Sequence, residues 1–196
     1  MNKPGKAASV DLGALAAQLS QGSLPPVHQW NPEFCGDIDM RIARDGTWFY
    51  MGTPIGRKPL VRLFSTVLRH DDDGKFYLVT PVEKIGITVD DAPFVAVEMT
   101  THGEGEGRAL VFRTNVDDEV IADADHPIRV EIEPETLEPS PYVLVRDNLW
   151  ALIARSVFYD LVALAEDGEI DGQPRFGIWS AGEFFPIGEP GWVADC

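Results

Sequence analysis

Hydrophobic and polar residues alternate along several short stretches of the chain, which is the pattern of half-buried β-strands. In DIDMRIARDG, residues 37–46, three aliphatic residues alternate with three charged ones. Asp45-Gly46 is a strong hairpin signal and leads into a second strand at 47–51. Similar patterns predict further strands at 75–80, 84–90, 93–99, 109–114, 126–132, 142–148, 176–180 and 183–188.

Apolar residues spaced three and four positions apart predict three helices. A short one at about 11–20 begins at a capping Asp11. A second follows Pro59 and carries its apolar stripe at 60–68. The strongest prediction is a third helix at about 149–164, for which Asp147 or Asn148 would be the N-cap. The stretch between this helix and 176, EDGEIDGQP, is predicted to be a loop.

Both halves of the chain show the same order of predicted elements: strands, a helix, an Asp-Gly turn and another strand. Aligning Leu60 with Leu149 pairs the apolar positions of the two predicted helices. The pattern therefore predicts an α+β protein of two similar units, each an antiparallel sheet packed by one main helix. We place an N-terminal tail and short helix at 1–26, the first α+β unit at 27–92 and the second at 93–196.

The excess of acidic over basic residues limits which partners the protein can bind. The 196 residues include 32 acidic and 16 basic side chains, a net charge of −16. Nucleic acids and anionic membranes both need a basic surface, so neither is an expected partner. No apolar run reaches the ~18 residues of a membrane span, and the N-terminus lacks the apolar core of a signal peptide. With only Cys35 and Cys196, we expect a reduced, cytoplasmic protein.

Several separated blocks resemble, in the same order, the bacterial domain-of-unknown-function family 1285. They lie between Val27 and Gly188 and include WNPEFCGDIDMRIARDGTWFYMGTPIGRKPLVRLFSTVL, YLVTPVEKIGITVDDAPF, DHPIRV, PYVLVR and WSAGEFFPIG. The resemblance implies a duplicated α/β architecture whose second half is pleckstrin-homology-like. For function it implies only a suggested signalling role through a pocket between the halves, and it brings no catalytic residues.

The stretch GTPIGRKPLVRLF, residues 52–64, looks like a phosphate-binding loop but does not have the required spacing. A P-loop reads G-x-x-x-x-G-K-[ST], in which the lysine reaches the phosphates and the hydroxyl holds magnesium. Here only three residues lie between Gly52 and Gly56, Arg57 precedes Lys58, and Pro59 replaces the hydroxyl residue. A glycine turn followed by a proline-initiated helix explains the stretch better.

Three cations at the start of this helix need a separate explanation. Arg57, Lys58 and Arg62 lie at the end where the helix dipole is positive, which disfavours cations by a few tenths of a kcal/mol. They could pair with carboxylates such as Asp37 and Asp39. Alternatively, they could hold an anionic ligand or an acidic partner.

The second alternative leads to a functional hypothesis. We expect a non-enzymatic binding module in which a cleft between the two units recognises an acidic partner or a small anionic ligand. Arg57, Lys58 and Arg62 would supply charge, and Trp48, Tyr50 and Trp150 would supply surface. The sequence leaves the identity of the partner and the oligomeric state open.

A competing hypothesis is an enzyme whose site is assembled from distant residues near Cys35 and Asp37. Cys35 is otherwise expected to be a small buried hydrophobe. The acidic turn HDDDG, residues 70–74, fails the calcium-loop pattern and is expected to be a solvated turn. The histidines show no metal-ligand spacing, so we predict no metal, no cofactor and no catalytic residue.

Overall fold

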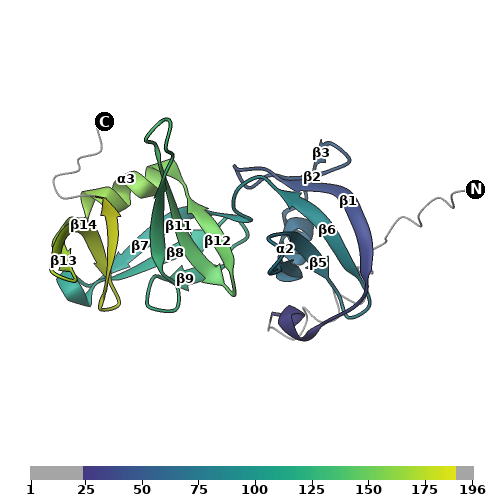
Figure 1. Ribbon diagram of the computed structural model, residues 1–196, viewed down its shortest axis with the longest axis horizontal. Coiled ribbons are helices and arrows are strands. Elements are labelled where there is room, and N and C mark those ends of the chain that lie inside the picture. Colours follow the sequence, from purple (N-terminus) through teal and green to yellow (C-terminus); the bar gives the residue numbers. More distant parts are fainter. Residues whose placement is uncertain (1–23, 189–196) are drawn as a thin grey trace, which may run out of the picture. The chain divides into compact units, whose positions relative to one another are not determined.

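The computed structural model describes residues 24–188, and the chain divides between Asp91 and Ala92 into two compact units. In the described part of each unit there is a six-stranded sheet and one α-helix, and the second unit adds a three-stranded sheet (Figure 1). This confirms the predicted α+β fold of two similar units. The helix predicted at 11–20 and Cys196 lie outside the described residues. Among residues 24–188, neither helix is long and apolar enough to cross a lipid bilayer.

The first unit forms one mixed sheet with the strand order β3-β2-β1-β6-β5-β4. Among residues 24–91, the one parallel pair joins β1 to β6, whereas the predicted sheet was entirely antiparallel. The elements, in chain order, are η1 (Val27–Gln29), β1 (Phe34–Ile42), β2 (Trp48–Tyr50), β3 (Thr53–Pro54), α2 (Lys58–Thr66), β4 (Leu68–His70), β5 (Phe76–Val79) and β6 (Lys84–Val89).

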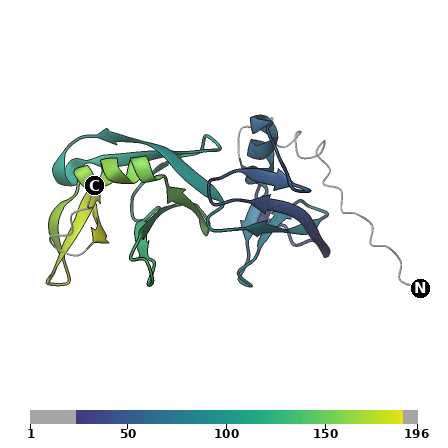
Figure 2. The ribbon, with the colours of Figure 1, turned by 90° about the horizontal axis from the view of Figure 1, so that it is seen from above.

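The two faces of this sheet have different environments. Met40 and Ile42 of β1 are buried on one face, together with Trp48, whose ring stacks on Phe64 of α2 at 6.1 Å between centroids. Figure 2 shows α2 on that side of the sheet. The alternate residues of β1, including Asp37, are exposed. We call the face that carries them, opposite α2, the open face.

The second unit repeats this sheet. Its order is β10-β11-β12-β7-β8-β9, and within residues 92–188 the one parallel pair joins β12 to β7. A separate sheet has the order β13-β14-β15. The elements are β7 (Phe94–His102), η2 (Gly105–Gly107), β8 (Ala109–Thr114), β9 (Glu119–Ile121), β10 (Ile128–Ile132), β11 (Pro139–Arg146), β12 (Leu149–Ile153), α3 (Arg155–Ala163), β13 (Glu166–Ile170), β14 (Gln173–Ser180) and β15 (Glu183–Gly188).

The two six-stranded sheets share one topology. In each, three consecutive strands form a meander, three later strands form another, and the last strand pairs in parallel with the first. The helices do not correspond, because α2 connects the two meanders of the first unit whereas α3 follows the second meander of the second unit. The sequence alignment of Leu60 with Leu149 therefore paired a helix with a strand and was wrong.

The helix predicted at 149–164 begins six residues too early. Leu149, Ala151 and Ile153 are buried on one side of strand β12, and α3 starts only at Arg155. Asp147 has a positive φ of 47° and forms, with Asn148, the two-residue turn between β11 and β12 rather than a helix cap. A short apolar run fits both the two-residue period of a strand and the 3.6-residue period of a helix. Its pattern alone therefore could not distinguish the two structures.

Besides β12, four strands were not predicted from the sequence. Three are the short strands β3, β4 and β9, and β4 begins where the second predicted helix was extended to Leu68. The fourth is β13, which lies in the segment predicted to be a loop. Its hairpin to β14 turns at Asp171-Gly172, both with positive φ, which is the conformation that a tight two-residue turn requires.

Two glycines leave room for an aromatic ring against the three-stranded sheet. The ring of Phe184 covers Gly168 of β13 and Gly177 of β14, where a Cβ would come within 2.4 and 2.6 Å of it. A Cβ at Gly177 would also lie 2.4 Å from the carbonyl oxygen of Phe185. The backbone cannot move away from this contact without breaking the β14–β15 pairing.

Gly177→Ala is therefore expected to lower the free energy of unfolding by about 1–3 kcal/mol, the range of overpacked sites. Gly56→Ala is the matched control, because a Cβ there meets no atom within 4 Å and φ is not positive. Urea denaturation of both variants measures the difference. Equal stability of the two variants would contradict the tight contact at Gly177.

Candidate functional site

The three cations of the candidate site lie together at the start of α2. Arg57 occupies the N-cap position, Lys58 begins the helix, and Arg62 follows one turn later; all three are exposed. The first turn contains no acidic residue, and no side chain caps it. Within residues 24–188, neither Arg57 nor Lys58 forms an ion pair.

The expected pairing of these cations with Asp37 and Asp39 is not found in the described part of the chain. Both carboxylates lie on the open face of β1, whereas α2 covers the other face of the sheet. Neither carboxylate forms an ion pair with a described residue. Arg57 and Lys58 therefore do not form the ion pairs with Asp37 and Asp39 that the sequence offered them.

The three aromatic candidates have different environments. Trp48 is only 1% exposed and belongs to the core. Tyr50 is 51% exposed, and its register opposite Met40 places it on the α2 side of the sheet, at the edge of β2. Trp150 belongs to the second unit, where the Arg129 guanidinium lies 4.0 Å above its ring. The structure thus brings the cations and Tyr50 to one side of the first sheet but places Trp48 in its interior.

The open face carries a feature that the sequence analysis missed. Gly86 of β6 lies between Asp37 of β1 and Tyr77 of β5 in the strand register. A Cβ on Gly86 would come within 2.0 Å of Asp37 Oδ1 and 3.6 Å of the Phe34 ring, so these groups occupy the space above the glycine. The Phe34 ring is 55% exposed and contacts Tyr77 edge to face, with 5.9 Å between centroids.

A β-bulge explains why Phe34 and Asp37 share this face. They are three positions apart in β1, whereas their partners Lys84 and Gly86 are only two positions apart in β6. Gly36, with a φ of 106°, absorbs the extra residue. An aromatic residue in a strand is normally assigned to the core, so the alternation pattern gave no sign of an exposed Phe34.

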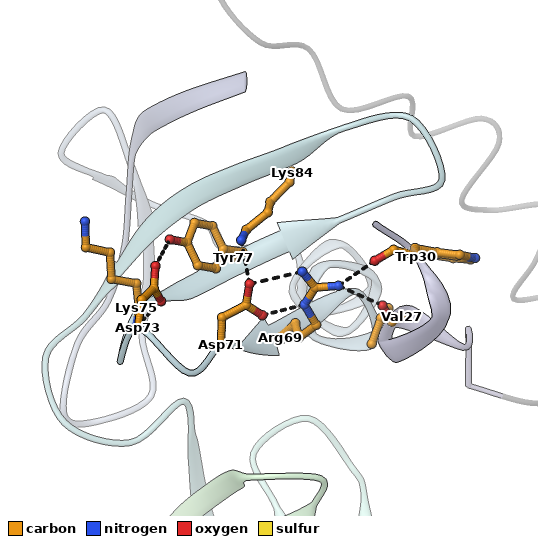
Figure 3. Close-up of polar contacts among 8 residues, drawn as sticks. All are labelled: Val27, Trp30, Arg69, Asp71, Asp73, Lys75, Tyr77 and Lys84. Carbon is orange, nitrogen blue, oxygen red and sulfur yellow. Dashed lines mark hydrogen bonds and ion pairs between the residues drawn. The ribbon is translucent and has the colours of Figure 1, made fainter. Parts of the chain in front are cut away.

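Next to this feature, Arg69 fastens the η1 segment to the sheet (Figure 3). Its Nη1 donates to the carbonyl oxygens of Val27 at 3.0 Å and Trp30 at 2.7 Å. Its Nε and Nη2 donate to the two carboxylate oxygens of Asp71 at 2.5 and 3.1 Å. Lys84 Nζ reaches the same carboxylate at 2.5 Å.

Tyr77 extends this network toward the β4–β5 turn. Its hydroxyl donates to Asp73 at 2.6 Å, and the Lys84 ammonium lies 3.9 Å above its ring. The hydrogen bond to Asp73, with burial and nearby carboxylates, raises the pKa of Tyr77 to about 12. The phenol therefore stays protonated and acts as a structural donor rather than a catalytic base.

Asp71 is the acidic centre of the network. Burial alone would raise its pKa, but the hydrogen bonds from Arg69 and Lys84 outweigh burial and hold the pKa below the ordinary value of 3.8. The acidic turn at 70–74 is thus not simply solvated, as the sequence suggested, because two of its aspartates accept hydrogen bonds from the sheet.

Other chemistry predicted from the sequence has less support. Cys35 is exposed, not buried as expected, and its thiol donates to the carbonyl oxygen of Glu33 at 3.4 Å. No group of three or more His, Cys, Asp or Glu side chains in residues 24–188 is arranged to hold a metal ion.

The similarities to known proteins follow the same division into two parts. Residues 25–92 match the model described as "Domain of unknown function (DUF1285), N-terminal domain". Residues 93–187 match "Protein of unknown function (DUF1285), C-terminal domain". No curated protein matches the chain.

Two crystal structures are similar to this chain. A DUF1285 family protein from Silicibacter pomeroyi DSS-3 is 53% identical over 90% of this chain and 95% of its own, with a TM-score of 0.80. A DUF1285 family protein from Shewanella baltica OS155 is 25% identical over 63% of this chain and 90% of its own, with a TM-score of 0.49.

Replacing Arg69 tests whether it fastens the η1 segment. Arg69→Gln is expected to destabilise the first unit by about 2–3 kcal/mol, because it removes a partly buried pair and two carbonyl contacts. Arg41→Gln, which removes the exposed pair with Asp90, should cost less than about 1 kcal/mol. Urea denaturation compares the variants, and limited proteolysis should show faster cleavage at 24–30 only for Arg69→Gln. Unchanged cleavage would contradict the fastening role.

The pKa of Asp71 gives a pH-dependent prediction. Because its pKa is lower in the folded than in the unfolded protein, its stabilisation is present above pH 3.8 and is lost as the pH falls through the folded pKa. The stability difference between the native protein and Asp71→Asn should therefore shrink between about pH 4 and pH 2. Urea denaturation at stepped pH measures this, with exposed Asp72→Asn as the control. A difference that stays constant down to pH 2 would rule out this role of Asp71.

Proposed function

Because the chain belongs to the DUF1285 family, whose matched descriptions state no activity, we propose a function from the chain's own surface. The protein is a non-enzymatic binding module, and its first unit recognises an acidic partner or a small anionic ligand through the start of α2. Arg57, Lys58 and Arg62 supply the positive charge, and Tyr50 supplies an aromatic surface on the same side of the sheet.

The observation that carries this proposal is the exposure of Arg57 and Lys58 without an ion pair in residues 24–188. In a chain with 32 acidic residues, a basic side chain has many possible partners, so an unused pair of cations is unusual. Both also lie at the end of α2 where the helix dipole disfavours positive charge by about 0.3–1 kcal/mol. An anion bound there would reverse this unfavourable interaction.

The second unit contributes its own cation–aromatic surface to the proposal. Arg129 lies over Trp150 at 4.0 Å and over Tyr142 at 5.3 Å, and it also pairs with Glu131 at 3.1 Å. Because Glu131 already offsets its charge, we assign anion recognition to the start of α2 and treat Trp150 as part of a separate surface of the second unit. Charge recognition of this kind suits a signalling protein, whose partner gains or loses negative charge on modification.

Binding of defined anionic probes tests the proposal. We expect phosphate, citrate or a ten-residue poly-glutamate peptide to raise the melting temperature of the full chain. Lys58→Gln should weaken the affinity for the bound probe about fivefold, and the double variant Arg57→Glu/Arg62→Glu should abolish binding. Isothermal titration calorimetry at low and high salt measures these affinities, which should fall as salt rises.

Lys75→Gln is the matched control, because Lys75 is an exposed lysine in the β4–β5 turn of the same unit. It should leave the affinity unchanged. Lys58→Gln, in contrast, should slightly raise the stability of the ligand-free protein, because it removes a cation from the positive end of α2. The proposal fails if the double variant retains affinity for every probe that the native protein binds, or if no probe binds.

A further inference from the structure

We propose that the open face of the first unit holds a binding site for an arginine side chain of a partner protein, formed by Phe34 and Asp37. The site lies on the face of the sheet opposite α2, so it is separate from the surface to which we assigned anion recognition. This site binds a cation, whereas the start of α2 is proposed to bind an anion. The two proposals are therefore independent of each other.

The aromatic part of the site is the ring of Phe34. A phenylalanine that is 55% exposed in a strand leaves much of its apolar surface in water. The ring is nevertheless held in place, because it stands edge to face on the buried Tyr77 and rests above Gly86. It is therefore a fixed aromatic surface that a cation can approach from solvent.

The acidic part is the carboxylate of Asp37. It lies beside Phe34 above Gly86, yet it makes no hydrogen bond or ion pair with any residue from 24 to 188. Its neighbours differ in this respect: Asp71 binds Arg69 and Lys84, and Asp73 binds Tyr77. The carboxylate oxygens of Asp37, next to the exposed Phe34 ring, therefore remain available to accept hydrogen bonds from a partner.

A neighbouring cation on β6 does not fill this place. Lys84 is opposite Phe34 in the strand register, but its ammonium is held by Asp71 at 2.5 Å and over the Tyr77 ring at 3.9 Å. Its charge is thus offset within the network. A second cation can stack on Phe34 and pair with Asp37 without displacing it.

The combination of groups favours arginine over other cations. A planar guanidinium can stack on an aromatic ring while its N–H groups point sideways to a carboxylate, which a lysine ammonium cannot do with the same geometry. The strongly negative chain also attracts basic segments of other proteins before contact. Because the ring and carboxylate are exposed on a sheet face, we assign the arginine to a protein surface or segment rather than to a free metabolite.

Labelled peptides test this site on the full chain by fluorescence anisotropy. The probe is a twelve-residue Gly/Ser peptide with two arginines, and matched peptides carry lysine or uncharged citrulline in their place. We expect the arginine peptide to bind most tightly and the citrulline peptide not to bind. Phe34→Leu and Asp37→Asn should each weaken arginine-peptide binding at least fivefold.

Two control variants separate this site from general charge attraction and from the start of α2. Asp72→Asn removes an exposed carboxylate from the same unit and should change the affinity less than twofold. Lys58→Gln should not weaken arginine-peptide binding. Thermal melts confirm folding, and if Phe34→Leu melts early, the comparison of Asp37→Asn with Asp72→Asn decides alone.

The proposal is overturned if Asp72→Asn weakens binding as much as Asp37→Asn, because the attraction would then be diffuse. It is also overturned if a folded Phe34→Leu binds like the native protein, if the lysine peptide binds as tightly as the arginine peptide, or if the arginine peptide does not bind.

Discussion

In each unit, the parallel pairing of one early and one late strand joins two three-stranded meanders into a single sheet. β1 pairs with β6 in the first unit, and β7 pairs with β12 in the second. Without this pairing each meander would be a separate three-stranded sheet with two open edges, close to the smallest sheet that is stable on its own. The pairing also builds the open-face site, because Phe34 and Asp37 come from β1 and Gly86 from β6. The backbone hydrogen bonds between β1 and β6 therefore hold the sheet together and also position Phe34 and Asp37 on its open face.

The sequence predicted most strands because alternation is a local property. It also predicted α2, whose start is marked by Pro59 and whose apolar stripe faces the core. It failed where the decisive interaction is not local. Residues 149–153 satisfy both a helical and a strand pattern, and only their pairing with β11 and β7 makes them a strand. The parallel pairs were missed for the same reason, since no local pattern specifies which distant strands meet.

The candidate sites also divide into residues that local sequence predicted and residues whose positions depend on long-range contacts. The cluster of Arg57, Lys58 and Arg62 could be predicted because consecutive turns of a helix bring neighbouring residues together. Trp48 was assigned to the surface by its type, but the α2 helix covers it. Phe34 and Arg69 were not predicted at all. Their roles depend on a bulge at Gly36, a missing side chain at Gly86 and two carbonyl groups about forty residues earlier in the chain.

The parallel pairs β1–β6 and β7–β12 also determine the order in which the strands can assemble during folding. Phe34 pairs with Lys84, fifty residues later, and Phe94 pairs with Ala151, fifty-seven residues later. Such long-range contacts make closure slow compared with the local hairpins that precede it. During synthesis, β1 must wait for β6 to leave the ribosome before the first sheet can close, and its unpaired edge is open until then. The bulge at Gly36 lies on the edge of β1 that is unpaired until β6 arrives. An irregular strand at such an edge discourages pairing with another chain.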